Sequence, residues 1–275
     1  MSGKLYLVAT PIGNLEDITL RALRIIKEVD LIAAEDTRNT LKLLNHFEIS
    51  KPLISYHRHN EEIKVDNLIE KLKNGENIAV VSDAGTPGIS DPGEVIVKTA
   101  IKNNIQVIPI PGACAAINAL IASGLDTKEF SFIGFLPLNK KLRKEKLDEI
   151  KNENKTSIIY EAPHKLKNTL QDLKEFVENR EIVLAREITK IHEEFIRGNI
   201  VEIISKSRDL KGEMIILIEG AEKKQKEVPL NNLSLEEHYQ YYEDLGLDKK
   251  EIIKKISKDR RVNKNDIYMK FINKN

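Results

Sequence analysis

The sequence predicts an α/β protein in which two α/β domains share one ligand site and a small helical tail follows. Short apolar runs alternate with segments of helical periodicity through most of the chain, which is typical of sheets covered by helices. At 275 residues the chain exceeds the usual size of one domain. The apolar run 78–81 leads into a long loop, 82–93, of unusual composition.

The loop 82–93 carries the strongest signal for a binding site. It holds three glycines, two prolines and two aspartates in twelve residues, a composition that disfavours both helix and strand. An ordinary turn between a strand and a helix needs only about two to six residues, and ligands bind at the carboxyl ends of strands in open α/β sheets. We therefore predict a binding loop. It does not read G-x-G-x-x-G, and the chain lacks G-x-x-x-x-G-K-[ST], so a dinucleotide fold and a P-loop have no support.

The other elements of the two domains follow from apolar periodicity and from turn residues. Strands are expected in residues 5–10, 31–34, 53–56, 78–81 and 106–109, and again in 130–135, 157–160, 182–185, 194–198 and 212–218. One helix is expected to start at about Thr19, and a second to end at about Phe47. A third is expected from Glu61 to Asn74, before a cap glycine at Gly75. Further helices are expected over 94–100, from about 111 to Ser123, and from His164 to Glu178. The domains are expected to be 1–112 and 113–222.

The character of the chain changes at residue 223, where a linker, 223–229, is expected to lead into a helix-turn-helix-like tail that ends at residue 275. Two capping boxes predict helix starts: Ser234 with Glu237, and Asp248 with Glu251. Residues 223–275 hold 13 Lys and Arg against 9 Asp and Glu, which leaves 31 against 34 in residues 1–222. This excess of positive charge is compatible with a nucleic-acid partner, although such a segment is more commonly a solvated helical appendage.

Composition excludes several classes of protein. Lys and Arg (44) nearly balance Asp and Glu (43), so net charge gives no evidence on a nucleic-acid partner. The single cysteine, Cys114, excludes an internal disulfide and a multi-cysteine metal site, and we expect no metal. No apolar run approaches the ~20 residues of a membrane span, and residues 1–4 lead into a strand without a signal-peptide core. We expect a cytoplasmic protein.

Five segments together point to one enzyme family: LVATPIGNLEDIT (7–19), AEDTR (34–38), SDAGTPGISDPG (82–93), PGA (111–113) and YEAPH (160–164). On these motifs the chain resembles the tetrapyrrole methylase-like, class III S-adenosylmethionine (SAM) methyltransferases, and among them the enzymes that modify small-subunit ribosomal RNA. The resemblance covers essentially the whole chain, including the tail. It implies methylation of the ribose 2′-oxygen of a cytidine in the decoding region of 16S rRNA, by a homodimer that holds SAM between its two α/β domains.

The resemblance also implies a set of SAM-binding residues. Those that match the family's site are Pro11, Gly13, Asp83, Ala84, Gly85, Thr86, Ile89, Ser90, Gly112, Ala113, Cys114, Tyr160, Glu161, Ala162, Ala185, Arg186 and Met214. Asp83 has a second interpretation, as an Asx-turn residue that stabilises its own loop. Cys114 is better explained by its small size than by reactivity, because no second cysteine supports redox chemistry.

Methyl transfer is an in-line displacement, so most of the protein's work is positioning. A ribose hydroxyl is a weak nucleophile that a general base would help. The sequence does not choose among the candidate bases Glu16, Asp36, His57, Glu161 and Glu187. The candidate phosphate contacts are Arg38, Lys140, Lys141, Arg143, Arg260 and Arg261. For Arg38 and Arg186, ion pairs to Glu35 or Glu187 are equally open, and a solvated helix face explains the basic run 140–146 equally well.

Two other functions stay open. The same fold methylates tetrapyrroles such as precorrins or uroporphyrinogen, although those enzymes lack such a helical tail. A SAM- or RNA-binding ribosome assembly factor without catalysis is the second. Activity on a porphyrinoid but not on ribosomal subunits favours the first, whereas ligand binding with no methyl incorporated into RNA favours the second.

Overall fold

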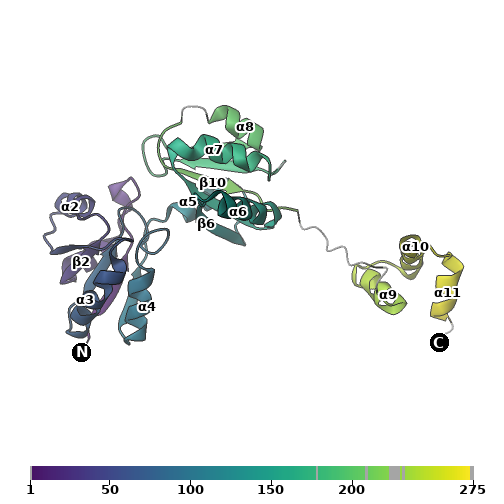
Figure 1. Cartoon of the computed structure of the whole chain (residues 1–275), viewed down its shortest axis with the longest axis horizontal. Helices are drawn as coiled ribbons and strands as arrows, with labels where there is room; N and C mark the ends of the chain where they lie inside the picture. The colour runs from purple at the N-terminus through teal and green to yellow at the C-terminus, as the bar shows by residue number, and fades with distance from the viewer. Residues whose placement is uncertain (1, 178, 208–209, 223–229, 231–232, 273–275) are drawn as a thin grey trace. The chain divides into compact units, whose positions relative to one another are not determined.

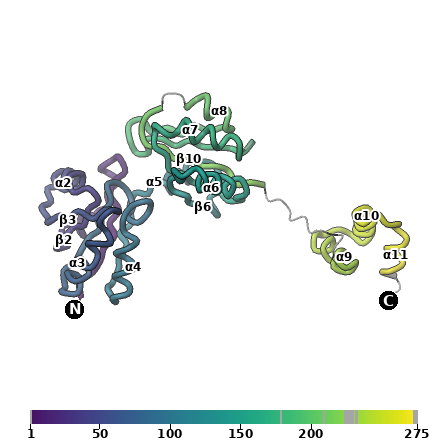
Figure 2. Tube along the Cα trace, viewed as in Figure 1, coloured from purple at the N-terminus to yellow at the C-terminus, as the bar shows by residue number. Residues whose placement is uncertain are grey.

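The computed structural model describes residues 2–177, 179–207, 210–222, 230 and 233–272. The chain divides into two compact units, Met1–Ala221 and Glu222–Asn275. The linker expected at 223–229 lies outside the described residues. The path of the chain through the elements of each unit can be followed in Figures 1 and 2.

The first half of the larger unit holds a parallel sheet, as its alternating strands and helices predict. Its order is β3-β2-β4-β1-β5, from β1 (Lys4–Val8), β2 (Leu31–Ala34), β3 (Leu53–Ser55), β4 (Ile78–Val81) and β5 (Gln106–Ile110). One face is covered by α1 (Leu20–Glu28) and α2 (Thr37–His46), and the other by α3 (Glu61–Lys73) and α4 (Glu94–Lys102). Figure 1 shows α3 and α4 side by side. Every residue of β2 and β4 is therefore buried.

Local sequence signals set the ends of these helices. The Thr19 side chain accepts a hydrogen bond from the Ala22 N–H at 3.0 Å and begins α1. The Asp36 side chain likewise accepts a hydrogen bond from the Arg38 N–H at 2.8 Å and caps the start of α2. Helix α3 ends just before Gly75, which adopts a φ of +97° as the expected cap glycine. A short 3₁₀ helix, Leu15–Asp17, precedes α1.

The second sheet differs from the first because it is mixed. Its order is β6-β7-β10-β8-β9, from β6 (Phe130–Phe135), β7 (Thr156–Glu161), β8 (Ile182–Arg186), β9 (Glu194–Gly198) and β10 (Met214–Ile218). Strands β6 and β7 pair in parallel, whereas β7–β10, β10–β8 and β8–β9 are antiparallel. The cause is the connection 187–193 between β8 and β9, which is a series of turns instead of a crossover helix.

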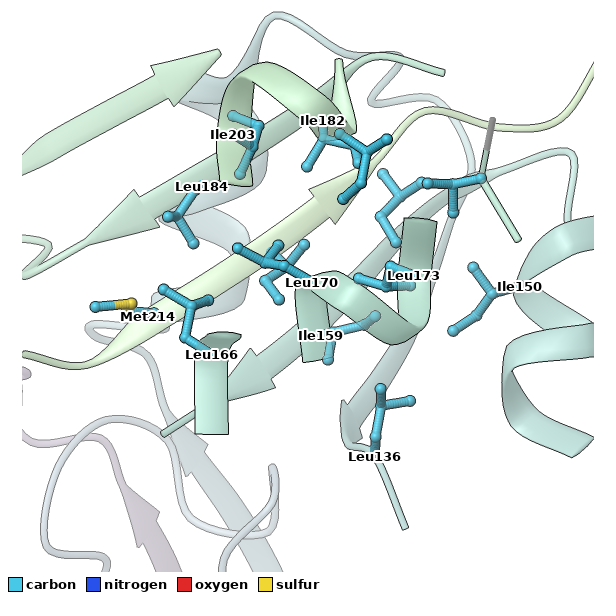
Figure 3. Packing of buried hydrophobic residues seen from close by; sticks show 14 of the residues in the cluster. Leu136, Ile150, Ile159, Leu166, Leu170, Leu173, Ile182, Leu184, Ile203 and Met214 are labelled. Carbon is cyan, nitrogen blue, oxygen red and sulfur yellow. The ribbon is translucent and has the colours of Figure 1, made fainter. Parts of the chain in front are cut away.

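Helices cover both faces of this second sheet. Helix α5 (Ala115–Ser123) packs on one face, and α6 (Lys140–Asn152), α7 (Pro163–Lys174) and α8 (Ile200–Lys206) pack on the other. Figure 3 shows Leu166, Leu170 and Leu173, which share one side of α7, among the side chains of the strands. The helix predicted from His164 to Glu178 thus starts one residue earlier and ends at Lys174, and Glu178 lies outside the described residues.

The smaller unit contains α9 (Leu235–Asp244), α10 (Lys249–Arg260) and α11 (Lys264–Ile272). Both predicted capping boxes are confirmed at the starts of α9 and α10. The core of this unit is formed by Tyr242, Ile252, Ile253, Ile256 and Ile267. Among the helices in the described ranges, none has the length and apolar character needed to cross a bilayer.

Leu170→Ala is expected to lower the free energy of unfolding of the larger unit by about 2–5 kcal/mol, because the substitution leaves a cavity in a fully buried core. Leu142→Ala on α6 is the control. It removes the same atoms from a side chain that is 53% exposed, and we expect a change of about 0.5 kcal/mol or less. Urea unfolding followed by circular dichroism measures both, and equal losses would contradict the packing in Figure 3.

Candidate functional site

The carboxyl ends of the parallel strands bring together loops that are distant in the sequence. Strands β1 and β4 are neighbours, so the segment after β1 meets the loop 82–93 after β4. The backbones of Thr10 and Gly85 exchange two hydrogen bonds, of 2.9 and 3.0 Å. The Thr86 hydroxyl donates to the Ala113 carbonyl oxygen at 3.0 Å and ties the loop to the start of α5.

A cavity of about 460 Å³ lies between this loop and the second sheet. Its volume falls in the usual range of about 300–1,000 Å³ for small-molecule sites. It is lined by Ile12, Glu35, Asp83, Ala84, Gly85, Thr86, Ile89, Ser90, Asp91, Cys114, Ala115, Phe135, Tyr160, Glu161, Ala162, Pro163, Ile188, Glu213, Met214 and Ile215. Both sheets of the larger unit therefore contribute to one site.

Most residues expected at a SAM site line this cavity. They are Asp83, Ala84, Gly85, Thr86, Ile89, Ser90, Cys114, Tyr160, Glu161, Ala162 and Met214. Six others do not line it: Pro11, Gly13, Gly112, Ala113, Ala185 and Arg186. Gly112 packs against Ala9, where an added Cβ would lie 2.9 Å from the Ala9 Cβ. Ala185 is fully buried in β8.

The sequence reasoning missed nine lining residues: Ile12, Glu35, Asp91, Ala115, Phe135, Pro163, Ile188, Glu213 and Ile215. Glu35 and Asp91 lie in the segments that follow the buried strands β2 and β4. Ligands bind at this end of the strands, so the position could have marked both residues as candidates. Phe135 pairs in register with Tyr160 across β6 and β7, which places both on one face of the sheet. Ile188 lies in the turns after β8, where no local pattern marks it.

Asp83 braces the central loop against the segment that follows β2. Its Oδ1 accepts a hydrogen bond from the Asp36 N–H at 3.0 Å, and its Oδ2 accepts one from the Asn39 side-chain amide at 3.2 Å. In return, Glu35 Oε2 accepts a hydrogen bond from the Asp83 N–H at 3.3 Å. The carboxylate therefore joins two loops, and both of its oxygens are engaged by protein donors.

The backbone of the loop adopts conformations that favour glycine at several positions. Gly85 and Gly93 have φ of +84° and +146°. Ser90 has a φ of +65°, in the left-handed region, which costs a non-glycine residue on the order of 1 kcal/mol or more. Arg58, from the segment between β3 and α3, donates a hydrogen bond to the Ser90 carbonyl oxygen. The loop is thus held in an unfavourable conformation by a contact from another element.

Burial alters the titration of several groups around the cavity. It raises the pKa of Glu35. Burial, together with the charges of Glu35 and Asp83, raises the pKa of Asp91 to about 6, although Arg58 opposes the shift. Burial also raises the pKa of Tyr160 to about 12, and the Tyr160 hydroxyl oxygen accepts a hydrogen bond from a backbone N–H of α5 at 3.1 Å.

Of the five candidate bases, Glu161 lines the cavity and the other four do not. Glu161 is 5% exposed, and it accepts hydrogen bonds from the Ala162 N–H at 2.8 Å and from the Thr169 hydroxyl. Its two oxygens are therefore engaged.

The remaining candidates are held in other contacts or exposed. Asp36 caps α2, and Arg38 holds the Asp36 pKa at about 2. Glu187 accepts from Lys190 at 3.0 Å, and His57 contacts a neighbouring asparagine through its ring. Glu16 is exposed in the short 3₁₀ helix.

The candidate phosphate contacts fall into exposed and engaged groups. Exposed side chains are those of Arg38, Lys140, Lys141 and Arg261. Arg143 is bound by Asp172 at 2.7 Å and by Thr169 at 2.8 Å. Arg260 donates to His238 Nδ1 at 3.0 Å and to three carbonyl oxygens of its own unit.

The ion pairs of Arg38 and Arg186 differ from the expected ones. Arg38 pairs with Asp36 at 2.7 Å instead of Glu35, because the Asp36 carboxylate caps α2 and Arg38 lies in the first turn of that helix. Arg186 pairs with Glu194 at 2.7 Å instead of Glu187. The cause is strand register, since Arg186 and Glu194 are direct partners on β8 and β9.

The lining chemistry fits SAM, which carries a sulfonium cation, an ammonium group and an adenosine. Small residues such as Ala84, Gly85 and Ala115 let a ligand approach the backbone closely. The carboxylates of Glu35 and Asp91 complement a cationic ligand. In the described part of the chain, no group of three or more His, Cys, Asp or Glu side chains is placed to hold a metal ion.

Comparisons with solved structures give the fold. The methyltransferase CobJ aligns with a TM-score of 0.61 at 17% identity, over 80% of this chain and 95% of that one. A uroporphyrin-III C-methyltransferase from Thermus thermophilus, complexed with S-adenyl homocysteine, aligns with a TM-score of 0.55 at 16% identity, over 79% and 97%. At such identities the likeness shows a shared fold.

Comparisons of sequence give the family. A model of the tetrapyrrole (corrin/porphyrin) methylases matches residues 4–204. A ribosomal RNA small subunit methyltransferase I of Halalkalibacterium halodurans is 53% identical over 97% of this chain and 93% of the relative. Its counterpart in Bacillus subtilis is 49% identical over the same shares. The motifs in the sequence therefore identified the family correctly: the chain belongs to the tetrapyrrole methylases and, within them, to the ribosomal RNA small subunit methyltransferase I family.

Proposed function

We propose that this chain transfers a methyl group from SAM to the ribose 2′-oxygen of a cytidine in the decoding region of 16S rRNA. One observation carries the proposal: the chain is about half identical, over nearly its whole length, to proteins named ribosomal RNA small subunit methyltransferase I. The cavity supports it, because it lies where the family motifs meet and its size and charge suit SAM. We further propose a homodimer that acts in the cytoplasm.

In this proposal SAM binds between an amino-terminal domain, 1–112, and a second domain, 113–222. The predicted SAM-binding residues that line the cavity contact it directly, and Gly112, Ala113 and Ala185 shape the walls behind them. SAM supplies a methyl group bound to a good leaving group. The chain's own residues bind and orient both substrates and keep water from the reacting atoms.

The RNA is proposed to approach with its target nucleotide turned out of any stacked helix, since the cavity is too small to admit a duplex. Exposed cations are proposed to hold the neighbouring phosphates, namely Arg38, Lys140, Lys141 and Arg261. Arg143 and Arg260 are assigned structural roles instead, because protein acceptors engage their guanidinium groups and both side chains are partly buried. Arg38 also has a protein partner, Asp36, but its side chain is 86% exposed.

Tetrapyrrole methylation is the second candidate, and the likeness to CobJ favours it. That likeness covers 80% of this chain, whereas the ribosomal RNA methyltransferases match 97% of it. Incubation of the protein with labelled SAM and unmodified small ribosomal subunits, followed by nucleoside mapping, tests the proposed function. We expect one 2′-O-methylcytidine in 16S rRNA. Label in a porphyrinoid but not in RNA would support the second candidate, and SAM binding without transfer would indicate an assembly factor.

Gly85→Ala is expected to weaken SAM binding by about tenfold or more, a loss of about 1.4 kcal/mol. Gly85 lines the cavity with a φ of +84°, and an added Cβ would lie 3.2 Å from Ile12 Cγ2. Gly88→Ala is the matched control, because Gly88 has a φ of +83° but nothing within 4 Å of an added Cβ. Both variants carry the same backbone strain. Titration calorimetry separates them, and equal losses of affinity would argue against Gly85 as a SAM contact.

The double substitution Lys140→Ala and Lys141→Ala is expected to weaken RNA binding and to reduce the slope of log affinity against log salt by about 1–2. Both lysines are exposed in the first turn of α6. Lys151→Ala, in the last turn of the same helix, is the control and is expected to leave the slope unchanged. Filter binding across a salt series measures all three proteins. A loss of the same size in the control would mean that overall charge, not this surface, drives binding.

A further inference from the structure

We propose that Asp91 accepts the proton of the ribose hydroxyl during methyl transfer. The inference rests on the proposed function and names a residue that was absent from the candidate bases found by sequence. Asp91 lines the cavity, half-buried, in the loop that follows β4.

Most of the other carboxylates of the cavity are less free to accept a proton. Glu161 and Asp83 each have both oxygens engaged by hydrogen-bond donors of the protein. Glu213 has a side chain that is 79% exposed and is paired with a lysine at 3.3 Å. Glu35 uses one oxygen to accept from the Asp83 N–H at 3.3 Å. Asp91 likewise has one such partner, since it accepts a hydrogen bond from the Ser82 side chain. Glu35 and Asp91 are therefore the lining carboxylates with the fewest hydrogen bonds to the fold, and Asp91 is the one that lies in the strained part of the loop 82–93.

The loop holds Asp91 at a fixed place. Ser90, directly before it, has a φ of +65° and its carbonyl oxygen accepts a hydrogen bond from Arg58. Directly after it, the Pro92 carbonyl oxygen accepts from the Gly88 N–H at 3.2 Å and closes the loop. Backbone strain of this kind persists where the surroundings impose it, and it is concentrated at functional sites. A proton acceptor needs such a fixed position relative to the reacting oxygen.

Charged and titratable groups face Asp91 from several elements. Glu35 after β2 and Asp83 in the same loop raise its pKa, and Arg58 before α3 lowers it. Tyr160 of β7 faces it from the second sheet. Burial is the largest cause, and together these effects place the pKa at about 6. A carboxylate with this pKa is ionised at neutral pH, and it is a stronger base than an ordinary aspartate.

In the proposed step, the ribose oxygen forms a bond to the methyl carbon as the carbon–sulfur bond breaks, and that bond's electron pair leaves with sulfur. The hydroxyl proton passes to a carboxylate oxygen of Asp91. The positive charge of the sulfonium and the negative charge of the carboxylate are both lost, so charge balances. Asp91 returns the proton to water after the products leave.

D91N tests the proposal, because asparagine keeps the shape of the side chain but does not accept a proton. We expect the single-turnover rate on unmodified small subunits, measured at saturating SAM, to fall by about 100-fold or more. This fall should exceed the loss of SAM affinity that calorimetry measures, because the affinity loses only the attraction of one carboxylate for the cation. In the wild type, kcat/KM should rise with pH through an apparent pKa near 6, and D91N should lose this dependence. The control D66N changes an exposed aspartate of α3 and should keep the wild-type rate and pH profile.

A second measurement reports on Asp91 without turnover. Its pKa in the folded chain lies above the ordinary value of 3.8, so its ionisation works against folding as pH rises from about 4 to about 6. D91N should therefore unfold at a higher temperature than the wild type at neutral pH, and the difference should disappear near pH 3.8. An aspartate with a purely structural role would instead give a lower unfolding temperature for D91N at neutral pH.

Three outcomes would overturn the proposal: a D91N protein with the wild-type rate, a loss of SAM affinity that accounts for the loss of rate, or loss of the pH dependence in E161Q but not in D91N. Failure of the proposed function is distinguishable from these. In that case the wild type itself adds no methyl group to ribosomal subunits, whereas the unfolding temperatures still report on the ionisation of Asp91.

Discussion

The pairing of β1 with β4 is the constraint on which the site depends. Beyond the ends of these parallel strands, Thr10 and Gly85 form an isolated antiparallel bridge with two backbone hydrogen bonds. Buried backbone groups that lose their partners cost free energy, so this contact holds the start of the central loop, and the side chains of Asp83 and Thr86 add to it. Gly85 makes the contact with a φ of +84°, a conformation that side chains disfavour. The backbone conformation at Gly85 is therefore part of what shapes the cavity wall.

The carboxylates around the cavity have two kinds of role: some stabilise the fold, and others face the ligand site. Asp83 uses both oxygens to brace the segment after β2, whereas Asp91 is half-buried beside Glu35 and Asp83 and titrates at about 6. An ionised acid in such a place works against folding. Sites of this kind persist when function requires them, because stability alone would favour a neutral side chain.

The sequence predicted the first sheet and the central loop because both depend on local signals. Apolar strands alternate with capped helices there, and glycines and prolines mark the turns. The mixed order of the second sheet was not predictable from such signals. Its cause is the series of turns at 187–193, and the sequence there does not distinguish turns from a short crossover helix. Phe135 and Ile188 reach the cavity through strand pairing and packing across the unit. Motif residues were found more readily, but Glu35 and Asp91 were overlooked although they lie inside motifs.

Ion pairs were the least predictable feature, because the partner of a charged residue is set by register and capping. Arg186 lies opposite Glu194 on the neighbouring strand and pairs with it at 2.7 Å, although Glu187 is adjacent in sequence. Arg38 likewise pairs with the aspartate that caps its own helix. Proximity along the chain is therefore weak evidence for an ion pair.

The helical tail shows why a count of basic residues is a poor measure of an RNA-binding surface. Arg260 donates its Nε–H to His238 Nδ1 at 3.0 Å, so that nitrogen is unprotonated, because arginine does not give up its proton. The same guanidinium reaches the carbonyl oxygens of Leu230, Leu233 and Ser234. Burial and the nearby charge of Arg260 lower the pKa of His238, although Asp259 opposes the shift. This cation stabilises the start of α9, and RNA contact by the tail would have to come from exposed residues such as Arg261.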